Sequence, residues 1–300
     1  MRGIVINVQK GLYKVRPVND GEDINCTLRG RLFKQSQTTK SMVVVGDYVE
    51  FQPVLGGRGV ITAIEERKSK LVRKGAGKKG SHLEQVVAAN VDQAILVFAV
   101  KNPKYRKNLI ERYIVSAKYG GIEPVICFNK IDLINLSEVQ EDIKEYRKLG
   151  YTVLLTSTIT GEGIKKLKSL LKDKISVFAG SSGVGKSSLV NAIFNEKKTK
   201  TNEVSTSHYK GKHTTTSSQV YELPFGGRII DVPGMREFGV IDNGTGIRDA
   251  FPDIIELAKQ CKFRNCSHIN EPGCAVKEAI ESGLLEERRY RNYLKLKKSG

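Results

Sequence analysis

The stretch G-S-S-G-V-G-K-S occupies residues 180–187 and directly follows the apolar run ISVFA. It matches the pattern G-x-x-x-x-G-K-[ST], and the segment SLVNAIF after it has the composition of a helix. A strand, a glycine-rich loop and a helix in this order place backbone N–H groups and a helix N-terminus around phosphate oxygens. The stretch therefore predicts an α/β domain with a phosphate-binding loop, the alternative being an ordinary glycine-rich turn.

This loop supplies most of the candidate nucleotide ligands. Lys186 is expected to reach the β- and γ-phosphates, and the Ser187 hydroxyl is expected to bind Mg²⁺. Loop glycines allow the backbone to curl toward the phosphates. The candidates are Gly180, Ser181, Ser182, Gly183, Val184, Gly185, Lys186, Ser187 and Ser188.

A second element, Asn129-Lys130-Ile131-Asp132, follows the apolar run PVICF and fits the N-K-x-D pattern of guanine-specific sites. The Asp132 carboxylate can accept hydrogen bonds from guanine N1–H and from the exocyclic amine, a donor pair that adenine lacks. Asn129 is expected to brace the loop, and the stem of Lys130 to lie over the purine. Ser157, within T-S-T after YTVLL, is a candidate for the guanine O6 loop, although the usual form ends in Ala and Thr158 stands there.

A third element, D-V-P-G at residues 231–234, predicts a switch that senses the γ-phosphate. Asp231 is expected to hold Mg²⁺ through water, and the Gly234 N–H to face the γ-phosphate. The run GKHTTT before it holds the candidate switch threonine, which we place at Thr215, although such a run also suits an edge strand. Because Met235 cannot orient water, we expect slow intrinsic hydrolysis. His213 is our candidate for positioning the water, the alternative being a solvated loop histidine.

These elements come in an unusual order. N-K-x-D precedes the glycine-rich loop, which precedes D-x-P-G, whereas small GTPases begin with the glycine-rich loop. A parallel sheet keeps its contacts when its original ends are joined and new ends are opened elsewhere. The order therefore indicates a circularly permuted GTPase domain whose switch leads directly into the C-terminal segment.

The changes of residue pattern along the chain predict three domains. Short alternating segments with frequent glycines predict a five-stranded β-barrel over residues 1–72. A basic linker over residues 73–85 precedes strands that alternate with helical stretches over residues 86–241, which predicts a parallel sheet covered by helices. Residues 242–300 form a mostly helical segment with a Cys/His cluster.

That cluster reads C-x4-C-x-H-x5-C and comprises Cys261, Cys266, His268 and Cys274. Three thiolates and one imidazole satisfy tetrahedral Zn²⁺, so we expect one structural zinc ion with no catalytic role. Disulfide pairing is the alternative, but it would leave one cysteine unpaired and is disfavoured in a reducing compartment. Cys26 and Cys127 lie in strand-like segments and are expected in the core.

The charge of the chain points to a polyanionic partner. The formal net charge is +18 over 300 residues. The first 80 residues hold 16 Lys and Arg against 7 Asp and Glu, half of the excess. Nucleic acid is the leading candidate ahead of a membrane surface, and general solubility is the other interpretation. The longest apolar run, residues 94–100, is too short to span a bilayer, and no signal-peptide core is present, so we expect a cytoplasmic protein.

The chain resembles the RsgA family, also called YjeQ or YloQ, of small ribosomal subunit biogenesis GTPases. The resemblance runs over nearly the whole chain through LRGRLFK, AANVDQ, NKID, TGEGI, GSSGVGKSSLVN, GKHTTT, DVPGMREFG and the Cys/His cluster. It implies an N-terminal OB-fold, a permuted P-loop GTPase and a C-terminal zinc domain. It also implies binding to the 30S subunit and its 16S rRNA, with hydrolysis stimulated by the subunit and controlling release. We expect a monomer.

OB-type barrels bind RNA through basic grooves and exposed aromatic residues. Our candidates are Arg29, Arg31, Phe33 and Lys34, although Phe33 also suits a buried core position. The basic tail (Arg288, Arg289, Arg291, Lys295, Lys297 and Lys298) is either a second phosphate-binding face or a solvated one. Two other function classes stay open: a GTP-gated RNA-binding protein with little hydrolysis, and a P-loop kinase, which would leave NKID unexplained.

Overall fold

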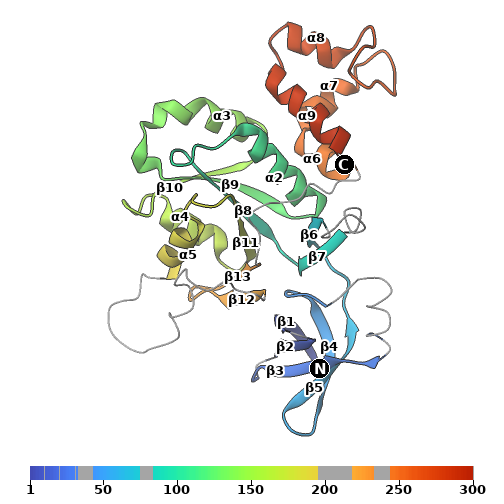
Figure 1. Cartoon of the computed structure of the whole chain (residues 1–300), viewed down its shortest axis with the longest axis vertical. Coiled ribbons are helices and arrows are strands. Elements are labelled where there is room, and N and C mark those ends of the chain that lie inside the picture. Colours follow the sequence, from blue (N-terminus) through green and yellow to red (C-terminus); the bar gives the residue numbers. More distant parts are fainter. Residues whose placement is uncertain are drawn as a thin grey trace.

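The computed structural model describes residues 1–9, 11–19, 21–30, 32, 43–74, 84–194, 218–232 and 244–299. Figure 1 shows a β-barrel at one end of the molecule, an α/β unit in the middle and a helical unit at the other end. The predicted fold class, an OB-like barrel followed by a P-loop α/β domain and a helical C-terminal unit, is confirmed.

The barrel is built from five strands in the order β1-β2-β3-β5-β4, and pairing of β1 with β4 closes it. These strands span Arg2–Gln9 (β1), Leu12–Pro17 (β2), Ile24–Leu28 (β3), Tyr48–Val54 (β4) and Arg58–Ile64 (β5). Val5, Val15, Cys26, Phe51 and Ile61 fill its core, because alternate residues of each strand point inward. β3 ends at Leu28, just before the candidate RNA-binding residue Arg29.

The central sheet has the order β10-β9-β8-β11-β13-β12. Its strands span Gln93–Ala99 (β8), Glu123–Asn129 (β9), Thr152–Thr156 (β10), Ile175–Ala179 (β11), Gln219–Glu222 (β12) and Arg228–Asp231 (β13). Five strands are parallel as predicted, but β12 runs antiparallel to β13, which corrects the expectation of a wholly parallel sheet. A short β12–β13 connection over residues 223–227 accounts for this, because a parallel pair needs a longer crossover.

Helices cover both faces of this sheet (Figure 1). Their bounds are Lys107–Tyr119 (α2), Gln140–Lys148 (α3), Ile164–Leu171 (α4) and Lys186–Phe194 (α5), with short 3₁₀ turns Ile131–Leu133 (η1) and Leu136–Val139 (η2). Leu96 and Phe98 of β8 lie in one core with α2 and α3, while Ile95 and Val97 lie in another with α4 and α5. Burial on both faces explains why β8 is apolar without alternation.

A hairpin joins the barrel to the sheet. Strands β6 (Lys70–Lys74) and β7 (Glu84–Ala89) pair antiparallel, so the expected linker over residues 73–85 begins and ends in strands, with residues 75–83 outside the described part. The Ala89 N–H donates to the Val45 carbonyl over 2.9 Å. A Cβ on Gly46, whose φ is +87°, would lie 2.1 Å from the Ala89 carbonyl oxygen, so this close approach requires glycine.

The C-terminal unit is mostly helical, as the sequence predicts, and its described residues form four helices. They span Thr245–Ala250 (α6), Pro252–Ala258 (α7), Ala275–Glu281 (α8) and Glu287–Ser299 (α9). Helices α6 and α9 pack on α2, where Glu111 receives hydrogen bonds from Arg288, Arg289 and Asn292. Within the described part of the chain, no helix combines the length and the apolar character that crossing a membrane requires.

Candidate functional site

The candidate nucleotide residues lie where the parallel strands end. Asn129 closes β9, Thr156 closes β10, Ala179 closes β11 and Asp231 closes β13. In an open α/β sheet the carboxyl ends of the strands share one edge, and ligands bind in the crevice outside that edge. The topology therefore gathers the three sequence elements on one side of the sheet.

The glycine-rich loop adopts a conformation that only glycine tolerates well. Gly180, Gly183 and Gly185 have φ values of +150°, +79° and +97°. A Cβ on Gly180 would lie 2.3 Å from the Val97 carbonyl oxygen, and one on Gly185 would lie 2.3 Å from Asn129 Nδ2. The glycines at these positions thus let the loop curl tightly against β8 and β9.

Lys186 begins α5 and its ammonium lies inside the loop. Nζ donates to the carbonyls of Gly180 and Ser181 over 2.6 and 2.8 Å. Ser187 and Ser188 are exposed on the first turn of α5, where free backbone N–H groups favour an anion. The Val184 side chain is buried beneath the loop, so only its backbone is available to a ligand.

The N-K-x-D element is hydrogen-bonded to the glycine-rich loop. The Asn129 amide donates to the Val184 carbonyl over 2.9 Å, and Lys130 Nζ donates to the Gly183 carbonyl over 2.7 Å and to that of Asn102. Asn129 Oδ1 in turn accepts from the Thr156 hydroxyl over 3.0 Å. Two segments more than 50 residues apart are therefore fixed to each other at the sheet edge.

Asp132 is exposed, and a neighbouring hydroxyl orients its carboxylate. The Ser157 hydroxyl donates to Asp132 Oδ1 over 2.5 Å and accepts the backbone N–H groups of Ile159 and Thr160. Asp132 Oδ2 takes part in no such bond within the described residues. The carboxylate is therefore held in place with acceptor capacity directed to solvent.

Asp231 is the one candidate catalytic residue within the described residues. Ile230, the residue before it, pairs in register with Val177 of β11. Asp231 therefore lies beside Phe178, two residues before Gly180. Burial raises the pKa of its carboxyl. A nearby divalent cation would offset this cost by favouring the ionised form. His213, Thr215 and Gly234 lie outside the described residues.

The Cys/His cluster is brought together as the spacing predicts. The candidate ligand atoms of Cys261, Cys266, His268 and Cys274 all lie within 4.8 Å of one another. His268 Nδ1 lies 3.6 Å from Cys261 Sγ and 3.4 Å from Cys274 Sγ, and these sulfurs are 3.9 Å apart. Bonds of about 2.3 Å in a tetrahedron give ligand separations of about 3.8 Å, so the cluster fits a metal ion, whereas a disulfide needs about 2.05 Å.

The loop that carries these ligands is held by its neighbours. Glu271 accepts the backbone N–H groups of Ser267, Ile269 and Asn270 over 2.7, 3.0 and 3.1 Å. Hydrogen bonding from the Ser267 side chain, together with backbone N–H groups, lowers the pKa of Glu271 to about 2. His268 has a φ of +66°, and the Tyr290 hydroxyl of α9 donates to its carbonyl. The ligand geometry is thus set by contacts that do not involve a metal.

The candidate RNA-binding residues are only partly described. Arg29 is exposed at the end of β3, and Arg31, Phe33 and Lys34 lie outside the described residues. In the basic tail, Arg288 and Arg289 pair with Glu111, and Arg291 pairs with Glu287. Arg289 is only 3% exposed, so the tail is not one uniform basic face.

Two family models cover most of the chain. The RsgA N-terminal domain matches residues 2–61, and the RsgA GTPase domain matches residues 64–241. The chain belongs to the RsgA GTPase family. RsgA-family membership makes it a GTP hydrolase, which confirms the predicted activity and disfavours the reading as a mere GTP-gated binding protein.

Relatives of the RsgA family match along the whole length. A small ribosomal subunit biogenesis GTPase from Caldanaerobacter subterraneus is 40% identical over 99% of this chain and 94% of its own. One from Chlorobaculum parvum is 38% identical over 99% and 97%.

Two crystal structures support the assignment of the chain to the RsgA family. YjeQ from Thermotoga maritima matches with a TM-score of 0.74 and 35% identity over 98% of this chain and 96% of its own. YloQ, described as a circularly permuted GTPase, matches with a TM-score of 0.74 and 31% identity over 98% and 92%. Its description agrees with the motif order of this RsgA-family chain.

Several contacts around the site have no signal in the sequence. The Thr156 side chain braces Asn129, a contact that the T-S-T element does not predict, and the Lys130 ammonium donates to the carbonyl of Asn102, which belongs to no motif. Glu111 is buried in α2 and is held by arginines about 180 residues away. Motif spacing locates ligands within one loop, but it does not report which distant segment supports that loop.

Proposed function

We propose that this GTP hydrolase binds guanine nucleotides at the carboxyl edge of the central sheet and acts in small (30S) ribosomal subunit biogenesis. The observation that carries the nucleotide site is the set of hydrogen bonds from Asn129 and Lys130 to the glycine-rich loop. They hold the base-recognition and phosphate-binding elements in one rigid arrangement. The names of the full-length relatives support the biological role.

In this proposal each residue has a chemical role. Asp132 accepts from guanine N1–H and the exocyclic amine, and Ser157 orients it. The loop from Gly180 to Ser188 binds the phosphates, with Lys186 on the β- and γ-phosphates. Ser187 and, through water, Asp231 hold Mg²⁺, which neutralises charge that develops on the phosphates. Thr215 and Gly234 contact the γ-phosphate, and His213 positions the attacking water.

The cluster of Cys261, Cys266, His268 and Cys274 holds one structural zinc ion in this proposal, with His268 binding through Nδ1. The separations of 3.4–3.9 Å among the donor atoms of Cys261, His268 and Cys274 support that choice, and all four donors lie within 4.8 Å of one another. All four positions of a tetrahedron are filled by side chains, which leaves no place for substrate. The ion therefore stabilises the C-terminal unit.

We propose the 30S subunit and its 16S rRNA as partners of a monomeric, cytoplasmic protein. The division is a barrel over residues 1–72, a connecting segment over 73–85, the GTPase domain over 86–241 and the zinc-binding unit over 242–300. The net charge of +18 supports an RNA partner, and Arg29, Arg31, Phe33 and Lys34 are the barrel's candidate contacts. Hydrolysis stimulated by the subunit then controls release.

Cosedimentation tests the partner. The full chain is mixed with purified 30S or 50S subunits, with GDP or a nonhydrolysable GTP analogue, at a fixed stated salt concentration, because polyanion binding depends steeply on salt. We expect the protein to pellet with 30S subunits and to do so more with the GTP analogue. Equal pelleting with both subunits, or none with 30S, would contradict the proposal.

A further inference from the structure

The hairpin of β12 and β13 lies, in the sequence, between the two elements of the proposed switch. Thr215 precedes β12 by four residues, and Asp231 is the last residue of β13. Gln219 begins β12 and pairs in register with Asp231. Any contact that holds β12 therefore also holds the backbone of the carboxylate that is proposed to bind Mg²⁺.

Strand β1 of the barrel pairs with this hairpin. β2 covers one edge of β1, and the other edge pairs first with β4, through residues 2–4, and then with β12, through Asn7 and Gln219. The pairing of β1 with β2 shifts register between Val5 and Asn7, and a bulge of this kind bends a strand and re-aims it. One strand thus both closes the barrel and extends the central sheet.

The two pairings form a single row across three strands. Asn7 of β1 lies opposite Gln219 of β12, which lies opposite Asp231 of β13. Because neighbouring strands are about 4.8 Å apart, β1 lies about 10 Å from the backbone of Asp231. Only one strand separates the barrel from this carboxylate.

An ion pair joins the barrel to the other end of β12. Arg16 of β2 lies 2.7 Å from Glu222, and Asp23 holds the same guanidinium at 2.6 Å. Glu222 is also 3.4 Å from Arg228 of β13. The pair between Arg16 and Glu222 is partly exposed, and such pairs contribute little to stability. Its loss should leave the barrel and the hairpin folded.

The barrel also packs on the second strand of the hairpin. Val8 of β1 packs against the barrel core and against the core of the α/β unit that contains Ile230. Gly46 lies beside Ile230, since a Cβ on Gly46 would be 3.3 Å from Ile230 Cδ1. Ile230 directly precedes Asp231, so the barrel contacts both strands next to the proposed Mg²⁺ residue.

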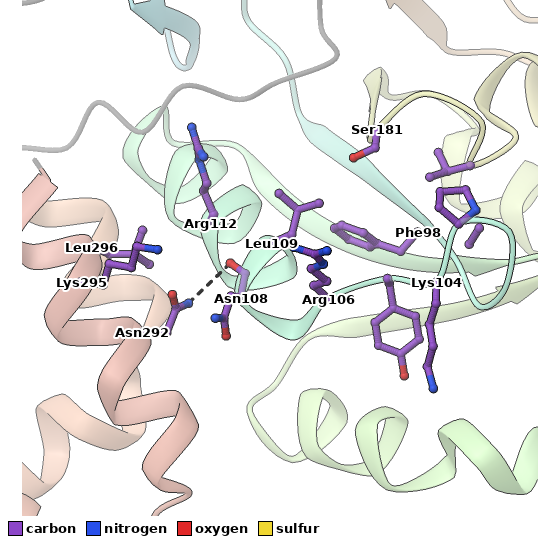
Figure 2. Close-up of a pocket in the computed structure, with 14 residues that line it drawn as sticks. Phe98, Lys104, Arg106, Asn108, Leu109, Arg112, Ser181, Asn292, Lys295 and Leu296 are labelled. Carbon is purple, nitrogen blue, oxygen red and sulfur yellow. Dashed lines mark hydrogen bonds between the residues drawn. The ribbon is translucent and has the colours of Figure 1, made fainter.

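The C-terminal unit meets the α/β unit at a different place. Figure 2 shows side chains of both units, from the start of α2 and from α9. These side chains line part of a cavity of about 720 Å³, and among the described residues none that lines it belongs to β12 or β13. Of these two interfaces, the one with the barrel includes the hairpin.

We propose that the barrel positions the β12–β13 hairpin, so that a subunit bound to the barrel moves Asp231 and thereby changes the rate of hydrolysis. Arg16 is a positioning residue, because it acts on Asp231 through Glu222 and the hairpin. The inference rests on the proposed function and names the contact through which the barrel acts on the nucleotide site.

The variant Arg16→Glu tests this contact on the full chain, with Arg2→Glu as the matched control. Arg2 also lies on a barrel strand and pairs with a carboxylate at 2.6 Å, but that carboxylate is Glu65 of the barrel. Pelleting and phosphate release are measured with GTP, with and without saturating 30S subunits. We expect both variants to pellet and to hydrolyse GTP alone as wild type does, while stimulation by 30S subunits falls about fivefold in Arg16→Glu only.

A crosslink provides the rescue. Asn7→Cys and Gln219→Cys are added to Arg16→Glu, because directly opposed residues of an antiparallel pair have Cα atoms about 4.5–5.5 Å apart, which a disulfide spans. Disulfide formation is verified by mass spectrometry. We expect oxidation to restore stimulation and dithiothreitol to remove it again, with wild type treated in the same way as the control.

Three outcomes would overturn the inference. They are equal stimulation of Arg16→Glu and Arg2→Glu, an oxidised crosslink that restores nothing, and a loss of pelleting confined to Arg16→Glu, since Arg16 would then contact the subunit itself. A wild type that 30S subunits neither pellet nor stimulate would instead contradict the proposed function, so the two failures are distinguishable.

Discussion

At the scale of single residues, Asp132 is the proposed base-recognition residue. Its carboxylate is fixed by the 2.5 Å bond from Ser157 and presents its remaining acceptor capacity outward. Asp132→Asn replaces an acceptor by an amide donor, so guanine loses two charge-assisted hydrogen bonds and xanthine, with a carbonyl at C2, gains a partner. We expect GDP affinity to fall on the order of 100-fold, while xanthosine diphosphate binds better than to wild type. Calorimetry with both nucleotides measures these affinities. An equal loss of affinity for GDP and for xanthosine diphosphate would contradict the role of Asp132.

Gly185 gives a second prediction at this scale. Gly185→Ala would place a Cβ 2.3 Å from Asn129 Nδ2 at a φ of +97°, which breaks the contact between the two nucleotide elements. We expect GTP affinity to fall at least tenfold. The control Gly150→Ala carries a similar positive φ of +87° with open space around it, so it should cost about 1 kcal/mol of stability and leave binding intact. Binding lost equally in both variants would mean that strain, not the Asn129 contact, is responsible.

The sequence predicts best which residues of a single motif lie close together. Spacing predicts Gly180 to Ser188 and the four cluster ligands because neighbours on one loop must meet one ligand. The contacts made by Thr156, Asn102 and Glu111 carry no such signal, since their partners are brought close only by the fold.

At the scale of elements, helix α9 is attached to α2 by a buried ionic network. Glu111 is 1% exposed and lies 3.1 and 3.3 Å from Arg288 and Arg289. Burial raises the pKa of Glu111, and the two arginines oppose that shift. Glu111→Gln would remove the carboxylate that the two arginines share, while Arg289 keeps Asp253 and Arg288 keeps Glu145 and Glu286. The loss of these charge-assisted hydrogen bonds should cost about 2 kcal/mol. Urea unfolding and faster amide exchange in α9 measure this, with the exposed Glu287→Gln as the neutral control. An α9 as protected as in wild type would contradict it.

Metal removal gives a second prediction, for the C-terminal unit. The two cysteines outside that unit, Cys26 and Cys127, serve as internal controls. Burial raises the pKa of the Cys26 thiol to about 11 and that of Cys127 to about 12, and both are fully buried in their cores. Because thiolate is the reactive form, these two should resist alkylation at pH 8 in the folded protein. A chelator should release zinc and expose three further thiols. The assignment would be contradicted if all five cysteines were alkylated without the chelator. It would also be contradicted if the alkylation of Cys261, Cys266 and Cys274 were the same with and without the chelator.

Elements were largely predictable because strand and helix periodicity is local. Strands β8 to β11 lie at the apolar runs 94–100, PVICF, YTVLL and ISVFA, and the C-terminal unit is mostly helical as expected. The antiparallel direction of β12 and the β6–β7 hairpin were not predicted, because strand direction and pairing depend on partners elsewhere in the chain.

At the scale of the whole molecule, the order of motifs places the proposed switch element D-V-P-G directly before the C-terminal unit in the chain. Asp231 closes β13 only 14 residues before α6 begins, and α6 packs on α2. The barrel meets the same sheet through β7 and through one bridge between Asn7 and Gln219. Both flanking units therefore contact the domain that binds the nucleotide, as Figure 1 shows.

The central claim is that the small subunit stimulates GTP hydrolysis by this chain. The direct measurement is phosphate release with GTP and Mg²⁺, alone and with 30S or 50S subunits, using Asp132→Asn as the matched control. We predict slow release alone, a rise of at least tenfold with 30S subunits, no such rise with 50S subunits and little activity in the variant. A rate unchanged by 30S subunits would contradict the account.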